Sequence, residues 1–344
     1  KAFGIDDIFI EKYLENPKHI EVQILGDKQG NLVHLYERDC SIQRRHQKVV
    51  EFTPALCLSE AQREAICSDA IKIAGAVNYR SAGTVEFLLD QDGNHYFIEM
   101  NPRIQVEHTV TEMVTGVDIV QSQILIAEGK SLNDPEINIK SQDDIKVRGY
   151  AIQCRITTED PANGFAPDTG TIELYRSASG YGIRLDGGNG FTGSEVTPYY
   201  DSLLVKITSW ALTFDGATRK AIRALRETQI KGVKTNIGFL LNVLNHPKFK
   251  EGNCNTGFIG ATPELFDIPK KADKELRVLN YIAYVVVNNT KGEKPKFNVP
   301  VFPKFTDEEI SKLSGTKQLL DEGGPSAVVD WVKNQKKLLI TDTT

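Results

Sequence analysis

The chain has 344 residues, enough for about two domains, and its 40% apolar and 25% charged residues are ordinary for a globular protein. The formal net charge is −5 at pH 7, which argues against a nucleic-acid partner because phosphate binding needs a basic face. The longest apolar run, residues 281–287, is far too short to cross a bilayer, so we expect no membrane partner.

The amino-terminal part is predicted to begin with strands. Residues 8–14 ("IFIEKYL") and 19–25 ("HIEVQIL") are rich in β-forming side chains. The turn "DKQGN" follows, and residues 32–37 ("LVHLYE") are predicted to return as a strand. The polar run 39–54 is predicted to be a loop.

Two helices are predicted next. The first begins at Ser59, because Ser59 and Gln62 have the spacing of a capping box. Apolar residues recur along it at helical spacing: Ala65, Ile66, Ala70, Ile73, Ala74 and Val77. The second helix runs from about Asp118 to Glu128 and ends at Gly129, a typical residue after a helix C-terminus.

A hairpin is predicted over residues 83–101, with Asp92-Gly93 at the centre of a two-residue type I′ turn. This register places Glu86 opposite Glu99. The other cross-strand pairs that it predicts are Thr84 with Asn101 and Leu88 with Phe97. Alternation puts the apolar side chains on the opposite face: Val85, Phe87, Leu89, Tyr96, Ile98 and Met100.

Directly opposed carboxylates repel each other, so this register requires a cation nearby. Two carboxylates and an amide oxygen are hard ligands of the kind that Mg²⁺ prefers, so Glu86, Glu99 and Asn101 are candidate metal ligands. The alternative is a solvated strand face with salt bridges to Lys or Arg.

Further polar residues surround the hairpin in the sequence. Those that follow it are Arg103, Gln105, Glu107 and His108, and those of the earlier loop are Gln43, Arg44, Arg45, His46 and Lys48. Acids for a metal together with a basic cluster for anionic oxygens are typical of a phosphoryl-transfer site. No Walker sequence is present, and "DGGNG" at 186–190 is predicted to be a turn.

The polar segment 133–144 carries a proline, and we place a subdomain boundary there. The next strand alternates, with Tyr150, Ile152, Cys154 and Ile156 on one face and Gln153 and Arg155 on the other. Further strands ("GTIELYR", "YGIRLD", "SLLVKI") and helices from about Ala217 and Asn236 continue to about residue 260.

The last residues are predicted to differ from the rest. A helix near 273–287 is followed by a Pro/Lys-rich linker, short helices near 307–313 and 325–333, and a strand-like terminus. The five cysteines form no CxxC pair, which indicates unpaired thiols in a reducing compartment. We expect the cytoplasm, or the mitochondrial matrix for a eukaryotic protein, since a targeting region cannot be judged from a chain that starts without Met.

Several segments resemble one known family. They are "FIEKYLENPKHIEVQILGD", "ERDCSIQRRHQKVVEFTPA", "GTVEFL", "FIEMNPRIQVEHTVTEMVTGVDIV" and "CRITTED". Over about residues 1–260 the chain is similar to the biotin carboxylase component of biotin-dependent carboxylases, an ATP-grasp family. Within it, "PDTGTIELYRSASGYGIRLDGGNGFTGSEVTPYYDSLLVK", "GVKTNIGFLLNVLNHPKF" and the terminal "LLITDTT" resemble the pyruvate carboxylases.

The resemblance implies an α+β fold. Residues 1–132 are expected to form the C-terminal half of an ATP-grasp domain with an antiparallel sheet. Residues 145–268 are expected to form the biotin carboxylase C-terminal subdomain, and 269–344 a linker or allosteric segment leading to a carboxyltransferase barrel. The implied reaction is the carboxylation of biotin with ATP and bicarbonate through carboxyphosphate, within the conversion of pyruvate to oxaloacetate.

The resemblance also implies a role for individual residues. Glu11, Lys12 and Leu14 match the segment that holds adenine, and His19 matches a ribose contact. The others match residues near the nucleotide phosphates (Gln43, His46), the metal ligands (Glu86, Glu99, Asn101), the bicarbonate pocket (Lys48, Arg103, Gln105, Val106), the general base (Glu107) and the residue that faces biotin (Arg155).

The implied cofactors are ATP, Mg²⁺ or Mn²⁺, and biotin carried on a separate domain, with bicarbonate as substrate. The implied partners are the biotin carboxyl carrier and carboxyltransferase domains of the same polypeptide, in a homo-oligomer that is a tetramer in the family. The family's amino-terminal subdomain and glycine-rich ATP lid have no match here, so we expect this chain alone to be inactive. The alternatives are a subunit of an acyl-CoA carboxylase and a structural or regulatory fragment.

Overall fold

The computed structural model describes residues 8, 10–188 and 190–268, and in the last part of the chain nine residues: 278, 279, 281, 282, 323, 324, 326, 327 and 330. The chain divides into two compact units, residues 1–270 and 271–344. The nine described residues of the second unit are helical, and the helices predicted near 273–287 and 325–333 otherwise lie outside the described residues. So do the linker, the helix near 307–313 and the terminal strand.

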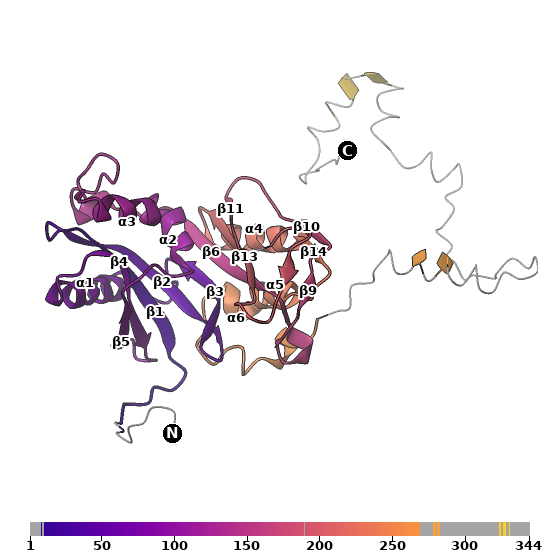
Figure 1. Cartoon of the computed structure of the whole chain (residues 1–344), viewed down its shortest axis with the longest axis horizontal. Coiled ribbons are helices and arrows are strands. Elements are labelled where there is room, and N and C mark those ends of the chain that lie inside the picture. Colours follow the sequence, from indigo (N-terminus) through magenta and orange to yellow (C-terminus); the bar gives the residue numbers. More distant parts are fainter. Residues whose placement is uncertain are drawn as a thin grey trace, which may run out of the picture. The chain divides into compact units, whose positions relative to one another are not determined.

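The first unit is built on an eight-stranded antiparallel sheet with the order β11-β13-β6-β3-β2-β1-β4-β5 (Figure 1). Its strands are β1 (Lys18–Gly26), β2 (Leu32–Arg44), β3 (Gln47–Thr53), β4 (Ser81–Leu89), β5 (His95–Asn101), β6 (Tyr150–Thr157), β11 (Ile183–Gly187) and β13 (Leu203–Ala211). Because this sheet runs from residue 18 to residue 211, the subdomain boundary placed at 133–144 stays a prediction.

Short strands and helices complete the unit. Three two-stranded pairs join β7 (Glu159–Asp160) to β8 (Ala166–Pro167), β9 (Gly170–Thr171) to β12 (Glu195–Val196) and β10 (Leu174–Arg176) to β14 (Gln229–Lys231). The helices are α1 (Glu60–Ala76), α2 (His108–Thr115), α3 (Ile119–Ala127), α4 (Phe214–Glu227), α5 (Ile237–Asn245) and α6 (Pro247–Lys250), with 3₁₀ turns at Gln142–Asp144, Pro161–Asn163 and Pro263–Phe266.

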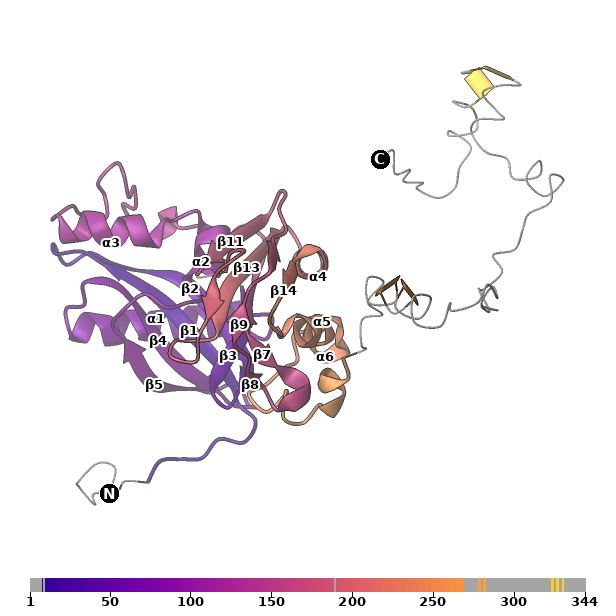
Figure 2. The ribbon, with the colours of Figure 1, turned by 45° about the vertical axis from the view of Figure 1, so that its right-hand side comes forward.

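Helices cover both faces of the sheet. On β1, Ile20, Val22 and Ile24 point to one face, where they pack against the buried stripe of α1. Leu25 points to the other face, where it packs with Ile119 and other residues of α3. In Figures 1 and 2, α1 and α3 lie on either side of the strands β1, β2 and β4. The same alternation places the polar residues of β1 on the face shared with α2 and α3.

The second half of the sheet has its own core. Ile152, Cys154 and Ile156 of β6 are fully buried and pack in one cluster with α4 and α5, as the predicted alternation requires. Arg155 therefore points to the opposite face, toward α2. The predicted helices near Ala217 and Asn236 correspond to α4 and α5, whose first residues are Phe214 and Ile237.

The base of the predicted hairpin is confirmed. Glu86 pairs with Glu99, and Thr84 pairs with Asn101, in the register derived from the sequence. These four residues lie in the half of the paired segment that is farther from the turn. The two opposed carboxylates of Glu86 and Glu99, for which the sequence predicts a nearby cation, are thus present.

The predicted pairing of Leu88 with Phe97 is wrong. A bulge shifts the register after Glu86, so Phe97 pairs with Phe87 and packs against its ring edge at 6.3 Å between centroids. Ile98 is the extra residue of the bulge, and it is exposed rather than part of the apolar face. A bulge inserts one residue and reverses the facing of the strand beyond it.

The turn explains the shift. Asp90 and Asn94 close a three-residue loop, with the backbone N–H of Asp90 bonded to the carbonyl of Asn94 at 2.9 Å. The Asp90 carboxylate also accepts the backbone N–H groups of Asp92 (3.0 Å) and Asn94 (2.8 Å). This side-chain capping favours the longer loop over the predicted two-residue turn, and Gly93 supplies its positive φ of 84°.

Two further predictions are corrected. The described residues of 8–14 form no strand, and Ile8 and Ile10 are almost fully exposed. The predicted loop 39–54 is mostly strand, because β2 continues to Arg44 and β3 begins at Gln47 after a tight turn. Five of its polar side chains are buried (Asp39, Ser41, Gln43, Glu51 and Thr53), whereas those of the turn are exposed (Arg45, His46 and Gln47). The helix α2 was not predicted.

The capping box of α1 is confirmed. The Ser59 hydroxyl accepts the backbone N–H of Gln62, and the Gln62 side chain accepts the backbone N–H of Ser59 at 3.0 Å. Asp118 caps α3 in the predicted place.

All five cysteines are unpaired, and four of them are buried. Among the described residues, no helix has the length and apolar character needed to cross a membrane.

Replacing Ser59 with Ala should lower the free energy of unfolding by about 1 kcal/mol, because the first turn of α1 loses its cap. Urea denaturation followed by circular dichroism measures this change. Ser68→Ala is the matched control, since Ser68 is exposed in the same helix and alanine favours helix. Equal losses for the two variants would contradict the capping role.

Candidate active site

A group of charged side chains is buried on the face of the sheet that α2 and α3 cover. Glu21 and Gln23 of β1 are fully buried there, and so is Arg38 of β2, which lies opposite Glu21 in the strand register. The Arg38 Nε donates to Glu21 Oε1 at 2.5 Å, and Nη1 donates to Gln23 Oε1 at 2.7 Å. Buried charges of this kind require partners of opposite charge.

Lys48 lies at the centre of three carboxylates. Its Nζ contacts Glu21, Glu86 Oε1 (2.9 Å) and Glu107 Oε1 (2.7 Å). Burial disfavours a charged lysine, but the carboxylates raise the pKa of Lys48 above its ordinary value. Burial likewise disfavours charge on Glu21, yet Arg38 and Lys48 lower its pKa to about 2. Lys48 and Glu21 are therefore both ionised at neutral pH.

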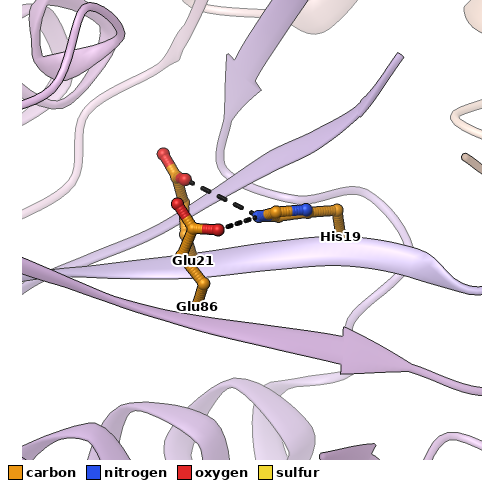
Figure 3. A group of neighbouring side chains, drawn as sticks. All are labelled: His19, Glu21 and Glu86. Atoms are coloured by element: carbon orange, nitrogen blue, oxygen red, sulfur yellow. Dashed lines mark ion pairs between the residues drawn. The ribbon is translucent and has the colours of Figure 1, made fainter. Parts of the chain in front are cut away.

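His19, Glu21 and Glu86 lie together at the edge of this group (Figure 3). His19 Nε2 lies 3.0 Å from Glu86 Oε2 and 3.9 Å from Glu21 Oε2. The other ring nitrogen, Nδ1, is 2.9 Å from the Gln43 amide nitrogen, which fixes the ring. Burial opposes ionisation of Glu86, but the His19 hydrogen bond and Lys48 lower its pKa to about 2.

The three predicted metal ligands converge. Asn101 Nδ2 donates to Glu86 Oε1 at 3.1 Å and to Glu99 Oε1 at 3.0 Å, so one donor bridges the two carboxylates. Glu86 is buried, whereas Glu99 is exposed. The two carboxylates suit a divalent cation, since Mg²⁺ takes one or two carboxylates and keeps its other positions for water or phosphate, whereas Asn101 presents its NH₂ group to them and its Oδ1 to Arg103. The salt-bridge alternative is also present in part, because Lys48 pairs with Glu86.

Glu107 joins the two halves of the sheet. It is the residue before α2, and its Oε2 lies 3.0 Å from Arg155 Nη2 of β6 while its Oε1 contacts Lys48 of β3. Arg155 Nε also donates to Glu51 Oε1 at 2.6 Å, and Gln153 holds the other oxygen of Glu51 at 2.8 Å. The guanidinium is thus fixed by two carboxylates.

Gln105 lies between the candidate metal ligand Glu86 and the buried Arg38. Its side-chain Nε2 donates to Glu86 Oε1 at 2.7 Å, and its Oε1 accepts from Arg38 Nη2 at 3.0 Å. The carbonyl of the next residue, Val106, accepts from Lys206 Nζ of β13 at 3.0 Å. A cavity of about 50 Å³ adjoins this loop, lined by residues that include Lys48, Val106 and Arg155.

Other predicted site residues lie farther out. Arg103 is exposed, and its guanidinium contacts Asn101 Oδ1 at 3.4 Å. His46 is exposed in the turn between β2 and β3, with a φ of 65°. Glu11 and Lys12 are exposed and Leu14 is half-buried. Lys12 bonds to Tyr96 at 2.9 Å rather than to the buried group.

Sequence reasoning missed Glu21, Arg38 and Glu51. Glu21 and Glu51 each stand between two apolar residues of a strand, and Arg38 stands between two acids. Both patterns are also typical of a solvated strand face. One signal was available: Glu21 and Gln23 alternate with Ile20, Val22 and Ile24, so they share one face of β1. Their burial could not be read from that pattern, because α2, which covers this face, had not been predicted.

A larger cavity lies elsewhere. It has a volume of about 1120 Å³ and lies on the opposite face of the sheet, between α1 and the segment 142–150. Its lining includes Glu37 and Arg63 but none of the predicted site residues. Cavity size therefore does not locate the candidate site, and the convergence of ionised groups does.

Two family models match the chain. Residues 1–135 match the carbamoyl-phosphate synthase L chain ATP-binding domain, and residues 153–261 match the biotin carboxylase C-terminal domain. Among curated proteins, the whole chain is 56% identical to a pyruvate carboxylase of Bacillus subtilis and 51% identical to pyruvate carboxylase 1 of Caenorhabditis elegans. It spans 30% and 29% of the length of these two relatives.

Solved structures agree with these matches. A complete multifunctional pyruvate carboxylase from Rhizobium etli is 51% identical, with a TM-score of 0.79 over 97% of this chain and 32% of that one. The biotin carboxylase domain of 2-oxoglutarate carboxylase from Hydrogenobacter thermophilus, in complex with MgADP and bicarbonate, is 52% identical, with a TM-score of 0.72 over 76% of this chain and 56% of that one. The chain therefore belongs to the biotin carboxylases of the biotin-dependent carboxylase family.

Proposed function

We propose that this chain carries the site at which a biotin-dependent carboxylase activates bicarbonate with ATP and transfers the carboxyl group to biotin. The observation that carries the proposal is the Glu107 carboxylate, which one lysine and one arginine hold between the candidate metal ligands and the small cavity. In support, the similar 2-oxoglutarate carboxylase domain binds MgADP and bicarbonate.

The first step needs an anion site and a base. Bicarbonate must lose a proton when its oxygen attacks the γ-phosphate, and a carboxylate within hydrogen-bond reach can accept that proton. Glu107 is buried beside the cavity and suits this role. Lys48 and the amide of Gln105 would hold the anion, with Arg103 and the backbone of Val106 closing the pocket.

The second step needs a fixed positive charge. When carboxyphosphate breaks down to CO₂ and phosphate, that phosphate can remove the N1 proton of biotin, and negative charge develops on the ureido oxygen. Arg155 suits stabilisation of that oxygen, because Glu51 and Glu107 fix its guanidinium and its strand faces the cavity.

The nucleotide would lie along β1 and the hairpin. Glu86, Glu99 and Asn101 would hold Mg²⁺ or Mn²⁺, which supplies positive charge against the phosphates. The side chains of His19 and Gln43 bind each other, so the two residues could contact the ribose and the phosphates of one nucleotide. His46 is near Gln43 in the sequence and is proposed to contact the phosphates as well. The adenine ring would be held by Glu11, Lys12 and Leu14, as the family resemblance implies.

The acceptor is inferred from the relatives. Pyruvate carboxylases match the chain over its whole length, which favours pyruvate and the formation of oxaloacetate. We therefore propose that biotin arrives on a carrier domain and that a carboxyltransferase domain of the same polypeptide receives the carboxyl group. A homo-oligomer, tetrameric as the family resemblance implies, and a location in the cytoplasm or mitochondrial matrix belong to the same proposal.

Glu107→Gln in the enzyme that carries this chain should lower kcat for bicarbonate-dependent ATP cleavage by at least about a hundredfold, because the base is lost. Phosphate release with and without bicarbonate measures it. Glu112→Gln is the matched control: Glu112 is also buried but pairs with Arg184 outside the site. Unchanged kinetics in Glu107→Gln would remove Glu107 from the base role.

Glu99→Gln should raise the Mg²⁺ concentration that half-saturates ATP cleavage, because one of two carboxylates at the metal site loses its charge. A metal titration at fixed ATP measures the shift, and titrating Mn²⁺ provides a second readout. Asp92→Asn serves as a control, since Asp92 is exposed at the tip of the same hairpin. If both variants titrate like the wild type, the metal assignment is wrong.

A further inference from the structure

Arg38 makes five side-chain hydrogen bonds within the site, and none of them goes to a candidate metal ligand or to Glu107. It is fully buried, and all five of its N–H groups have acceptors. These acceptors are Glu21 (2.5 Å), Gln23 (2.7 Å), Thr111 (3.1 Å), Thr84 (3.2 Å) and Gln105 (3.0 Å). They lie on β1, β4, α2 and the loop before α2.

Only one of these acceptors belongs to the proposed anion pocket. Arg38 Nη2 donates to Gln105 Oε1, so the amide oxygen of Gln105 is occupied. The amide NH₂ group must then point the other way, where it donates to Glu86 Oε1 at 2.7 Å. A guanidinium has no acceptor, so the reversed amide would direct NH₂ against Arg38 and its oxygen against Glu86.

We propose that Arg38 is a positioning residue for bicarbonate: it fixes the Gln105 side-chain amide so that N–H donors face the anion. The inference rests on the proposed function. None of the hydrogen-bond partners of Arg38 lines the cavity that adjoins the loop. The effect of Arg38 on the anion is exerted through Gln105, whose orientation decides whether the pocket presents a donor or an acceptor to a negative charge.

A lysine cannot replace this arginine. The ammonium group keeps the charge opposite Glu21, but it has three donors around one atom and cannot reach five acceptors on separate elements. Arg38→Lys therefore keeps the positive charge beside Glu21 but removes the hydrogen bond that orients the Gln105 amide. Gln105 would lose one of the two contacts that fix its amide and keep only the one to Glu86, so the amide is held less firmly and bicarbonate binding weakens while the metal and nucleotide contacts remain.

The test is steady-state ATP cleavage by the enzyme that carries this chain, with bicarbonate and MgATP varied separately. Arg38→Lys should raise KM for bicarbonate by about tenfold, the effect expected for a charge-assisted hydrogen bond, and leave KM for MgATP within about twofold. In a Gln105→Ala background, Arg38→Lys should cause no further rise, because the interaction it supports is already gone.

A purely structural role predicts a different pattern. Arg63→Lys is the control, since Arg63 also binds a buried glutamate, Glu37, at 2.8 Å on the opposite face of the sheet. It should reduce stability and leave KM for bicarbonate unchanged. If Arg38→Lys does not fold, Thr111→Val removes one acceptor of Arg38 and should raise KM for bicarbonate by a smaller factor.

The inference is overturned if folded Arg38→Lys binds bicarbonate like the wild type, or if its effect multiplies with that of Gln105→Ala. It is also overturned if Arg38→Lys is unfolded and Thr111→Val has the wild-type KM for bicarbonate. Failure of the proposed function looks different: the wild-type enzyme would then cleave ATP without any dependence on bicarbonate.

Discussion

The rest of the site depends on the ion pairs of Lys48 with Glu21, Glu86 and Glu107. Three carboxylates that share one face of a sheet would repel each other, and removing them from water is costly. Lys48 neutralises part of that charge, while Arg38 and Arg155 neutralise the rest from either side. Because the partners come from β1, β3, β4 and the start of α2, the network also fixes how these elements pack. Losing one partner of such a network leaves a buried charge unpaired, which typically costs about 3–5 kcal/mol.

The same network gives the site its two chemical sides. Glu86 lies on the hairpin beside Glu99, where two carboxylates would suit a divalent cation, and Glu107 pairs with Lys48 and Arg155, which line the cavity. Gln105 lies between them and bonds to Glu86. In the proposed reaction, fixed charges of opposite sign at these positions would stabilise the transferring phosphoryl and carboxyl groups without reorganising. This arrangement explains why the site is built on a rigid sheet.

Much of this arrangement could be predicted from the sequence. The pairing of Glu86 with Glu99 followed from the hairpin signal, and the direction of Arg155 followed from strand alternation. The error beyond Glu86 arose because Asp90 caps a longer loop, an interaction between a side chain and its own turn that two-residue turn rules do not include. Glu21 and Arg38 could not be predicted as site residues, because a charged residue in a strand faces solvent unless another element covers it. The helix that covers this face is α2, which begins at His108. The polar residues around its start were interpreted only as site residues, and no helix was predicted there.

The central claim is that the charged network activates bicarbonate at the γ-phosphate of ATP. The most direct measurement uses the full enzyme with ¹⁸O-labelled bicarbonate, with the released phosphate analysed by mass spectrometry. If a bicarbonate oxygen attacks the γ-phosphate, one ¹⁸O atom must appear in the phosphate in each biotin-dependent turnover. Phosphate released without the label during such turnover would contradict the account, since water and not bicarbonate would then be the nucleophile.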